Sequence, residues 1–189
     1  DSFVAIDKLI SERPEDADKL IEALKNDFVG YEELHAFLKN APKFGNGTPE
    51  VDNEAAEIVA KVSDIVSSHK NYLGNPFRPD WASPTTHLTY GYWVGATPDG
   101  RKKGEPFAPG ANPMHGRDTN GAIASLSSVA KLSFEDAQDG ISNTFSIIPG
   151  ALGKEDQIFV GDIDVDLDCG NGACFEPTLF DGLDADENQ

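Results

Sequence analysis

The residues best suited to chemistry lie in one long loop, Gly95 to Asp118, which contains four prolines and five glycines. A loop of more than about 15 residues without secondary structure is usually functional or disordered in a compact domain. This loop is rich in defined turns. In Pro98-Asp99-Gly100 the proline fixes φ, the aspartate accepts a hydrogen bond from a following amide, and the glycine tolerates positive φ. The pattern therefore predicts an ordered loop.

The same loop holds the concentrated basic residues of the chain, which are Arg101, Lys102, Lys103 and Arg117. One interpretation is that they bind a carboxylate or phosphate, since a guanidinium offers a planar, bidentate fork. The other is that Arg101 and Arg117 hold the loop by pairing with Asp99 or Asp118 and with backbone carbonyls. We favour the second interpretation, because Arg and Asp are neighbours between turn glycines. Lys102 and Lys103 are then solvated.

His115 is the loop residue best suited to proton transfer, because histidine titrates near neutral pH. No second histidine lies close to it in the sequence, so we favour a packing role. Ser125, Ser127 and Ser128 lack the Gly-x-Ser-x-Gly turn of a hydrolase nucleophile. We assign no catalytic residue. The structural loop candidates are Asp99, Arg101, His115, Arg117 and Asp118.

A second group of chemically active residues lies near the end of the chain. In a strand, alternation with Ile163, Val165 and Leu167 would place four carboxylates on one face, those of Asp162, Asp164, Asp166 and Asp168. Such a face repels itself unless it is solvated or binds a cation. The spacing misses that of a calcium-binding EF-hand loop by one residue, so we favour a solvated acidic end and no metal.

The two cysteines, Cys169 and Cys174, are separated by a spacing that permits a disulfide or two soft metal ligands. No second Cys or His pair supports zinc, and we favour two free thiols in a reducing cytoplasm. Asn46-Gly47-Thr48 forms a glycosylation sequon, whose use we do not favour.

Charge narrows the classes of partner. The formal net charge is −18, and residues 155–189 contain 11 Asp or Glu and no Lys or Arg. A field of this sign disfavours nucleic acid and anionic membrane. No apolar run approaches the roughly 20 residues that a membrane span requires. We expect neither partner.

The elements that must position the loop follow from apolar spacing. Stripes of helical period predict three short helices within residues 2–38, the first capped by Ser2, with a solvated His35 on the third. A longer helix is predicted from Val51 to about His69. β-Branched and aromatic residues predict a strand over 85–93, small residues a helix over 121–132, and an apolar run a buried strand over 141–148. Alternating helices and strands indicate an α/β fold.

Three segments carry a family resemblance. They are NAPKFGNGTPEVD at 40–52, ATPDGRKKGEPFAPGANPMHGRDTNGAIASLSSVAKL at 96–132, and DGISNTFSIIPGALGKED at 139–156. Together they resemble pyruvate formate-lyase, or formate C-acetyltransferase, a glycyl radical enzyme. The resemblance divides the chain into residues 1–154, a segment of that enzyme's barrel, and residues 155–189, an acidic C-terminal extension without a match.

The resemblance implies a fold, a reaction and a location. The fold is part of a ten-stranded α/β barrel, with a helical N-terminal part. In the complete enzyme a glycyl radical, installed by an activating enzyme, is relayed to a cysteine thiyl. That thiyl cleaves pyruvate, acetyl passes to coenzyme A, and formate leaves. Expected partners are the remainder of such an enzyme or a second copy of the chain. The expected location is the cytoplasm, and the expected process is anaerobic metabolism.

The chain departs from the family at its reactive groups. The Arg-Val-Ser-Gly-Tyr motif and the adjacent Cys-Cys pair do not occur in its sequence. We therefore interpret it as a fragment or partial copy that supplies scaffold and loop, holds no cofactor and is inactive alone. The alternatives are a non-catalytic acidic module, with or without a bound cation, and a segment of another glycyl radical lyase or dehydratase.

Overall fold

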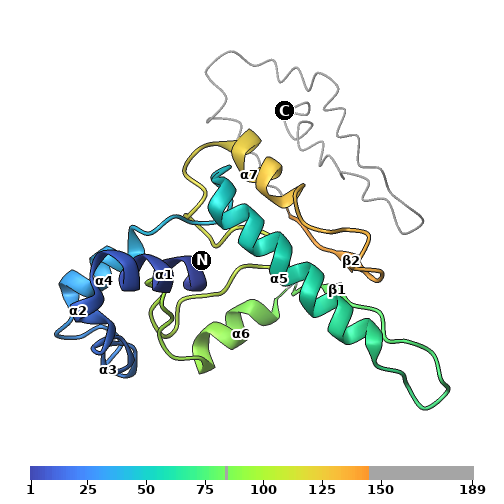
Figure 1. The fold of residues 1–189 in the computed structure, drawn as a ribbon, viewed down its shortest axis with the longest axis horizontal. Coiled ribbons are helices and arrows are strands. Elements are labelled where there is room, and N and C mark those ends of the chain that lie inside the picture. Colours follow the sequence, from blue (N-terminus) through green and yellow to red (C-terminus); the bar gives the residue numbers. More distant parts are fainter. Residues whose placement is uncertain (84, 145–189) are drawn as a thin grey trace, which may run out of the picture.

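The computed structural model describes residues 1–83 and 85–144 (Figure 1). The predicted cation face, both cysteines and the acidic extension lie outside these residues. So does half of the predicted strand 141–148, namely residues 145–148. In the described part the elements are α1 (Ser2–Glu12), α2 (Pro14–Ala17), α3 (Leu20–Lys25), α4 (Glu32–Lys39), α5 (Pro49–Ser68), β1 (Asp80–Trp81), α6 (Thr86–Trp93), α7 (Ala122–Val129) and β2 (Gly140–Ile141).

The N-terminal helices α1 to α4 gather on one side of the molecule (Figure 1). Their apolar faces enclose a core that includes Ala5, Leu9, Leu20, Ala23, Phe28, Leu34 and Leu38. The predicted helical stripes are confirmed, and α2 is an additional turn, which begins with Pro14 at its first position. The predicted cap is wrong: Asp1 precedes α1, and the Ser2 hydroxyl instead donates to Asp99.

The long helix α5 confirms the helix predicted from Val51 to about His69, and it crosses the middle of the molecule (Figure 1). Pro49 occupies its first turn, where the missing amide hydrogen costs nothing. Val59 of α5 contributes to a second core with Val129, Leu132, Ala137 and Ile141. This core joins α5 to the region of α7 and β2.

Two very short strands, β1 and β2, pair in parallel, with Asp80 opposite Gly140 and Trp81 opposite Ile141. Together with the helices they give an α/β arrangement in the described residues. Among these residues, no helix combines the length and apolarity that a membrane span requires.

The predicted strand over 85–93 is wrong, because these residues form α6. Its β-branched and aromatic composition misled the prediction. Contacts from the following loop supply the reason: Gly104 N–H donates to Gly91 O at 2.9 Å, and the Arg101 guanidinium reaches carbonyls at the helix end. Carbonyls left open at a helix C-terminus are stabilised by such donors.

Candidate functional site

One buried guanidinium organises the loop that follows α6. Arg101 has no solvent-exposed surface, and its side chain donates to Lys102 O at 3.0 Å, to Glu105 O at 2.8 Å and, in a short contact, to Gly95 O. It also donates to Thr97 Oγ1 at 3.2 Å. A guanidinium has five N–H donors in a fixed fork, which explains why one side chain can hold several turns of the loop.

The phenyl ring of Phe107 covers this guanidinium, with 4.0 Å between the guanidinium carbon and the ring centroid. Burial lowers the pKa of Arg101 from its ordinary value, while the nearby carboxylates of Asp99 and Glu105 act in the opposite direction. The Arg101 guanidinium thus contacts backbone oxygens and an aromatic ring, and none of its surface is available to bind a substrate anion.

Asp99 is buried beside Arg101, but the described residues contain no direct ion pair between the two. Its Oδ1 accepts from Ser2 Oγ at 3.0 Å, which ties the loop to the start of α1. The expected pairing of Arg101 with a carboxylate is therefore replaced by pairing with carbonyls. Asp99 serves as a countercharge at longer range.

Lys43 is a second buried cation in the same region. Its Nζ donates to Leu38 O at 3.1 Å and to Ala41 O at 2.7 Å. Loss of hydration on burial lowers the pKa of Lys43 to about 8, an effect that the negative charge of Asp99 partly opposes. Lys43 closes the C-terminal end of α4, where open carbonyls favour a cation.

His35 links α4 to the same loop. Its Nε2 lies 2.9 Å from Gly100 O, and its ring stacks on Phe28 with 4.5 Å between centroids. The prediction of a solvated histidine is therefore wrong. Helical spacing could not reveal a partner that lies 65 positions away in the sequence.

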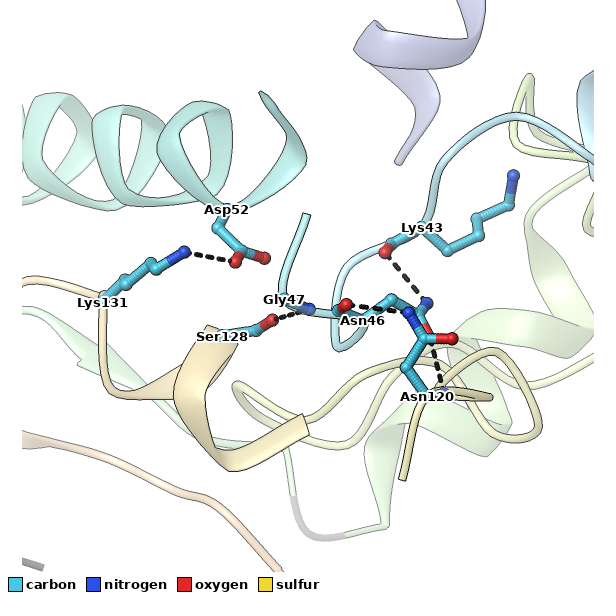
Figure 2. Close-up of polar contacts among 7 residues, drawn as sticks. All are labelled: Lys43, Asn46, Gly47, Asp52, Asn120, Ser128 and Lys131. Carbon is cyan, nitrogen blue, oxygen red and sulfur yellow. Dashed lines mark hydrogen bonds and ion pairs between the residues drawn. The ribbon is translucent and has the colours of Figure 1, made fainter. Parts of the chain in front are cut away.

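The centre of the site is Asn46, which joins two loops (Figure 2). Its Nδ2 donates to Lys43 O at 3.1 Å and to Arg117 O at 2.8 Å. Its Oδ1 accepts from Thr119 N at 2.8 Å, from Thr119 Oγ1 at 3.3 Å and from Asn120 N at 3.1 Å. Asn120 Nδ2 donates in return to Asn46 O at 3.0 Å. We call this arrangement the asparagine junction.

Close packing surrounds the asparagine junction. Gly45 has φ +94°, and a Cβ at this position would lie 2.3 Å from Pro113 Cγ, which is inside contact distance. Gly47 N–H donates to the buried Ser128 Oγ at 3.0 Å. Only a residue without a side chain fits where the two loops cross at Gly45.

An ion pair closes the junction on its other side. Lys131 Nζ lies 2.7 Å from Oδ2 of Asp52, whose side chain is fully buried in the first turns of α5 (Figure 2). A carboxylate is favoured near a helix N-terminus, because the open amides there carry partial positive charge. The ion pair thus holds the segment after α7 against the start of α5.

The side chains of the other predicted residues take no part in this centre. His115 and Asp118 are exposed, and Arg117 is half-buried. Within residues 1–83 and 85–144, the Arg117 side chain makes no hydrogen bond or ion pair, and only its backbone takes part. The structure therefore brings together Asp99 and Arg101, but not His115 and Asp118.

Sequence reasoning missed Lys43, Asn46, Asp52, Ser128 and Lys131. A signal existed for Asn46, since it lies within the FGNG turn between a proline-rich break and a helix. The sequon reading of this residue conflicts with the geometry, because both amide hydrogens of Asn46 are donated to carbonyls. A glycan would replace one of these hydrogens.

The chemistry of the described residues is that of positioning. They contain no cluster of His, Cys, Asp or Glu suited to a metal ion, and they include no thiol. Both polar atoms of the Asn46 side chain are bound by other parts of the chain. What this arrangement can do is fix two distant segments of chain against each other.

Comparison with known proteins assigns the two sides of the asparagine junction to two different family models. Residues 1–91 match the family model described as pyruvate formate lyase-like, and residues 107–164 match the one described as glycine radical. Asn46 lies in the first match, and Arg117, Thr119 and Asn120 lie in the second. The asparagine junction is therefore a contact between the two matched segments.

Individual relatives agree with these matches. The chain is 50% identical over 117 residues to formate acetyltransferase 1 of Escherichia coli strain K12, which covers 62% of this chain and 15% of the relative. Among solved structures it is similar to the B12-independent glycerol dehydratase of Clostridium butyricum, with 40% identity and a TM-score of 0.71 over 74% of this chain. A glycyl radical enzyme of Archaeoglobus fulgidus gives 34% identity and a TM-score of 0.70, also over 74% of this chain.

The chain spans about a sixth of the length of these relatives, since it covers 15% of the first protein and 18% of each structure.

Proposed function

Because this chain belongs to the pyruvate formate-lyase-like glycyl radical enzymes, as a partial segment of one, we propose that residues 1–144 are a wall of their ten-stranded α/β barrel. The role proposed for this segment is scaffold: it positions the loop 95–118 for an active centre built by the rest of the enzyme. The reaction proposed for the complete enzyme is acetyl transfer from pyruvate to coenzyme A with release of formate.

The asparagine junction is the observation that carries the scaffold role. Five hydrogen bonds made by Asn46 and Asn120 connect the two family segments across more than 70 positions of sequence. The Asn46 side chain at its centre is half-buried, and a hydrogen-bond network of this kind favours one arrangement of the chain over alternatives. A loop held in this way keeps its shape when substrate and cofactor chemistry take place beside it.

Helix α6 supports the proposal that more protein packs here. Half of its eight residues are large apolar or aromatic side chains, and all four are more than half exposed, with Tyr92 and Trp93 each at 69%. Apolar surface of this kind on a helix is usually buried. The parallel pair of β1 and β2 also indicates that further protein packs here, because parallel sheets occur almost only with both faces covered. The partner proposed for both surfaces is the remainder of the barrel.

The described residues do not supply the groups that glycyl radical chemistry requires, which are a radical-bearing glycine motif and a thiol. The glycine radical match is consistent with a protein glycyl radical in the full enzyme. The described residues offer no thiol to receive it, and the Arg-Val-Ser-Gly-Tyr motif does not occur in this sequence. We therefore derive no radical step for these residues, and expect the 189-residue chain alone to release no formate.

A segment exchange tests the proposal. The matched segment of formate acetyltransferase 1 is replaced by that of this chain, the host is activated anaerobically, and formate is measured from pyruvate and coenzyme A. We expect an active chimera, and a weaker one when glycerol dehydratase is the host and glycerol is the substrate. We expect the acetyltransferase chimera to be the more active one because the chain is 50% identical to formate acetyltransferase 1 and 40% identical to the glycerol dehydratase.

Two tyrosines provide a matched control for the barrel contact. Tyr92→Asp on α6 should abolish activity of the chimera, whereas Tyr72→Asp, at a side chain that is 95% exposed beyond α5, should preserve it. A folded but inactive chimera would contradict the scaffold role. A dehydratase chimera that outperforms the acetyltransferase chimera would overturn the proposed reaction while leaving the scaffold role in place.

A further inference from the structure

Two Asn-Gly pairs meet at the asparagine junction, Asn46-Gly47 and Asn120-Gly121. In this dipeptide the glycine nitrogen can attack the side-chain amide carbon of the asparagine, because glycine has no Cβ to block the approach. A C–N bond forms, ammonia leaves, and water opens the resulting succinimide to aspartate or isoaspartate. The reaction needs only water and a deprotonated glycine nitrogen.

The first pair is held against this reaction. Five contacts bind both atoms of the Asn46 amide, so its carbon cannot rotate toward the next residue without losing them. Gly47 N–H, the group that must act as nucleophile, donates to Ser128 Oγ. Gly47 itself is exposed, but Ser128 is fully buried, so the acceptor of this hydrogen bond is shielded from water.

The second pair lacks both restraints. The Asn120 side chain makes one hydrogen bond, from Nδ2 to Asn46 O, and both Asn120 and Gly121 are exposed. Within the part of the chain that the structure describes, Gly121 N–H has no acceptor. Gly121 has φ +87° and a Cβ there would meet nothing within 4 Å, so its surroundings are open.

We propose that Asn120 is a site of spontaneous deamidation, and that Asn46, with the same neighbour in sequence, is protected by the fold. The product changes the junction. A carboxylate at position 120 replaces the Nδ2 donor by an acceptor that faces the carbonyl oxygen of Asn46. Isoaspartate also adds a backbone carbon to the turn that presents Asn120 N–H to Asn46 Oδ1. Deamidation thus weakens the contact between the two family segments as the protein ages.

The test compares the two sites within one protein. The full chain is incubated at mildly alkaline pH, digested, and analysed by mass spectrometry for the mass gain of deamidation and for isoaspartate. We expect position 120 to react at least about tenfold faster than position 46, because a group held by several hydrogen bonds reacts only after local opening. In concentrated denaturant the two rates should converge.

Equal rates in the folded protein, or faster reaction at Asn46, would overturn the proposal. The consequence is tested separately with Asn120→Asp and Asn120→Gln. The aspartate variant should increase hydrogen exchange of the amides of Thr119 and Asn120, and the glutamine variant, which keeps an amide and resists cyclisation, should change it less. Unchanged exchange in the aspartate variant would refute the effect on the junction.

Discussion

Two arginines of one loop differ in their expected contribution to stability, and replacing each by methionine measures the difference. Methionine retains much of the aliphatic stem and removes the guanidinium. At Arg101 this leaves the oxygens of Gly95, Lys102 and Glu105 without their donor. At Arg117 no side-chain hydrogen bond within the described residues is lost, although the stem is half-buried.

The magnitude follows from these contacts. Hydrogen bonds to charged groups contribute about 1.5–3 kcal/mol each, and three close ones give a gross loss of roughly 4.5–9 kcal/mol. The guanidinium no longer has to be desolvated, which offsets part of that loss, so the net cost resembles the roughly 3–5 kcal/mol of a broken buried pair. For a chain of this size, that lowers the melting temperature by about 6–20 °C.

Thermal and urea unfolding of both variants, followed by circular dichroism, checks this prediction. We expect Arg101→Met to be strongly destabilised and Arg117→Met to change the free energy of unfolding by less than about 1 kcal/mol. Equal effects would refute the reasoning, because the two substitutions remove the same chemical group and differ only in what that group contacts.

Three further predictions concern other parts of the molecule. Gly45→Ala should destabilise the fold more than Gly116→Ala, because both glycines have positive φ but only the first would bring a Cβ to 2.3 Å from Pro113; equal melting temperatures would contradict the close crossing of the loops. Since the pKa of Lys43 in the folded chain is about 8 and that of free lysine is about 10.4, the unfolded chain binds more protons between these values, and Lys43 makes stability rise with pH across that window. Urea titrations of wild type and Lys43→Met at several pH values should show this rise in the wild type alone, and parallel curves would refute it. Millimolar calcium should leave the melting temperature nearly unchanged, as expected of a solvated acidic end; a saturable increase would instead support a cation site at Asp162, Asp164, Asp166 and Asp168.

Local patterns in the sequence determined much of the framework. Apolar residues at helical spacing predicted the N-terminal helices, α5 and α7, because each helix must bury one stripe of its surface. The turn residues around Asp99 predicted an ordered loop, since proline and glycine restrict the backbone wherever they occur. Three segments of residues sufficed to indicate the family, which the comparisons then showed.

Tertiary structure decided which side chains the framework uses. Arg101 and Arg117 have similar sequence surroundings, and only the fold places one against several carbonyls and leaves the other half-exposed. Residues 85–93 favour a strand by composition, yet they form a helix whose end is completed by donors from the following loop. Asn46 is one polar residue in a turn until residues 117–120 arrive beside it. These outcomes depend on hydrogen-bond partners that the fold supplies, within 10 positions at Arg101 and more than 70 positions away at Asn46. Local propensity contains no information about either kind of partner.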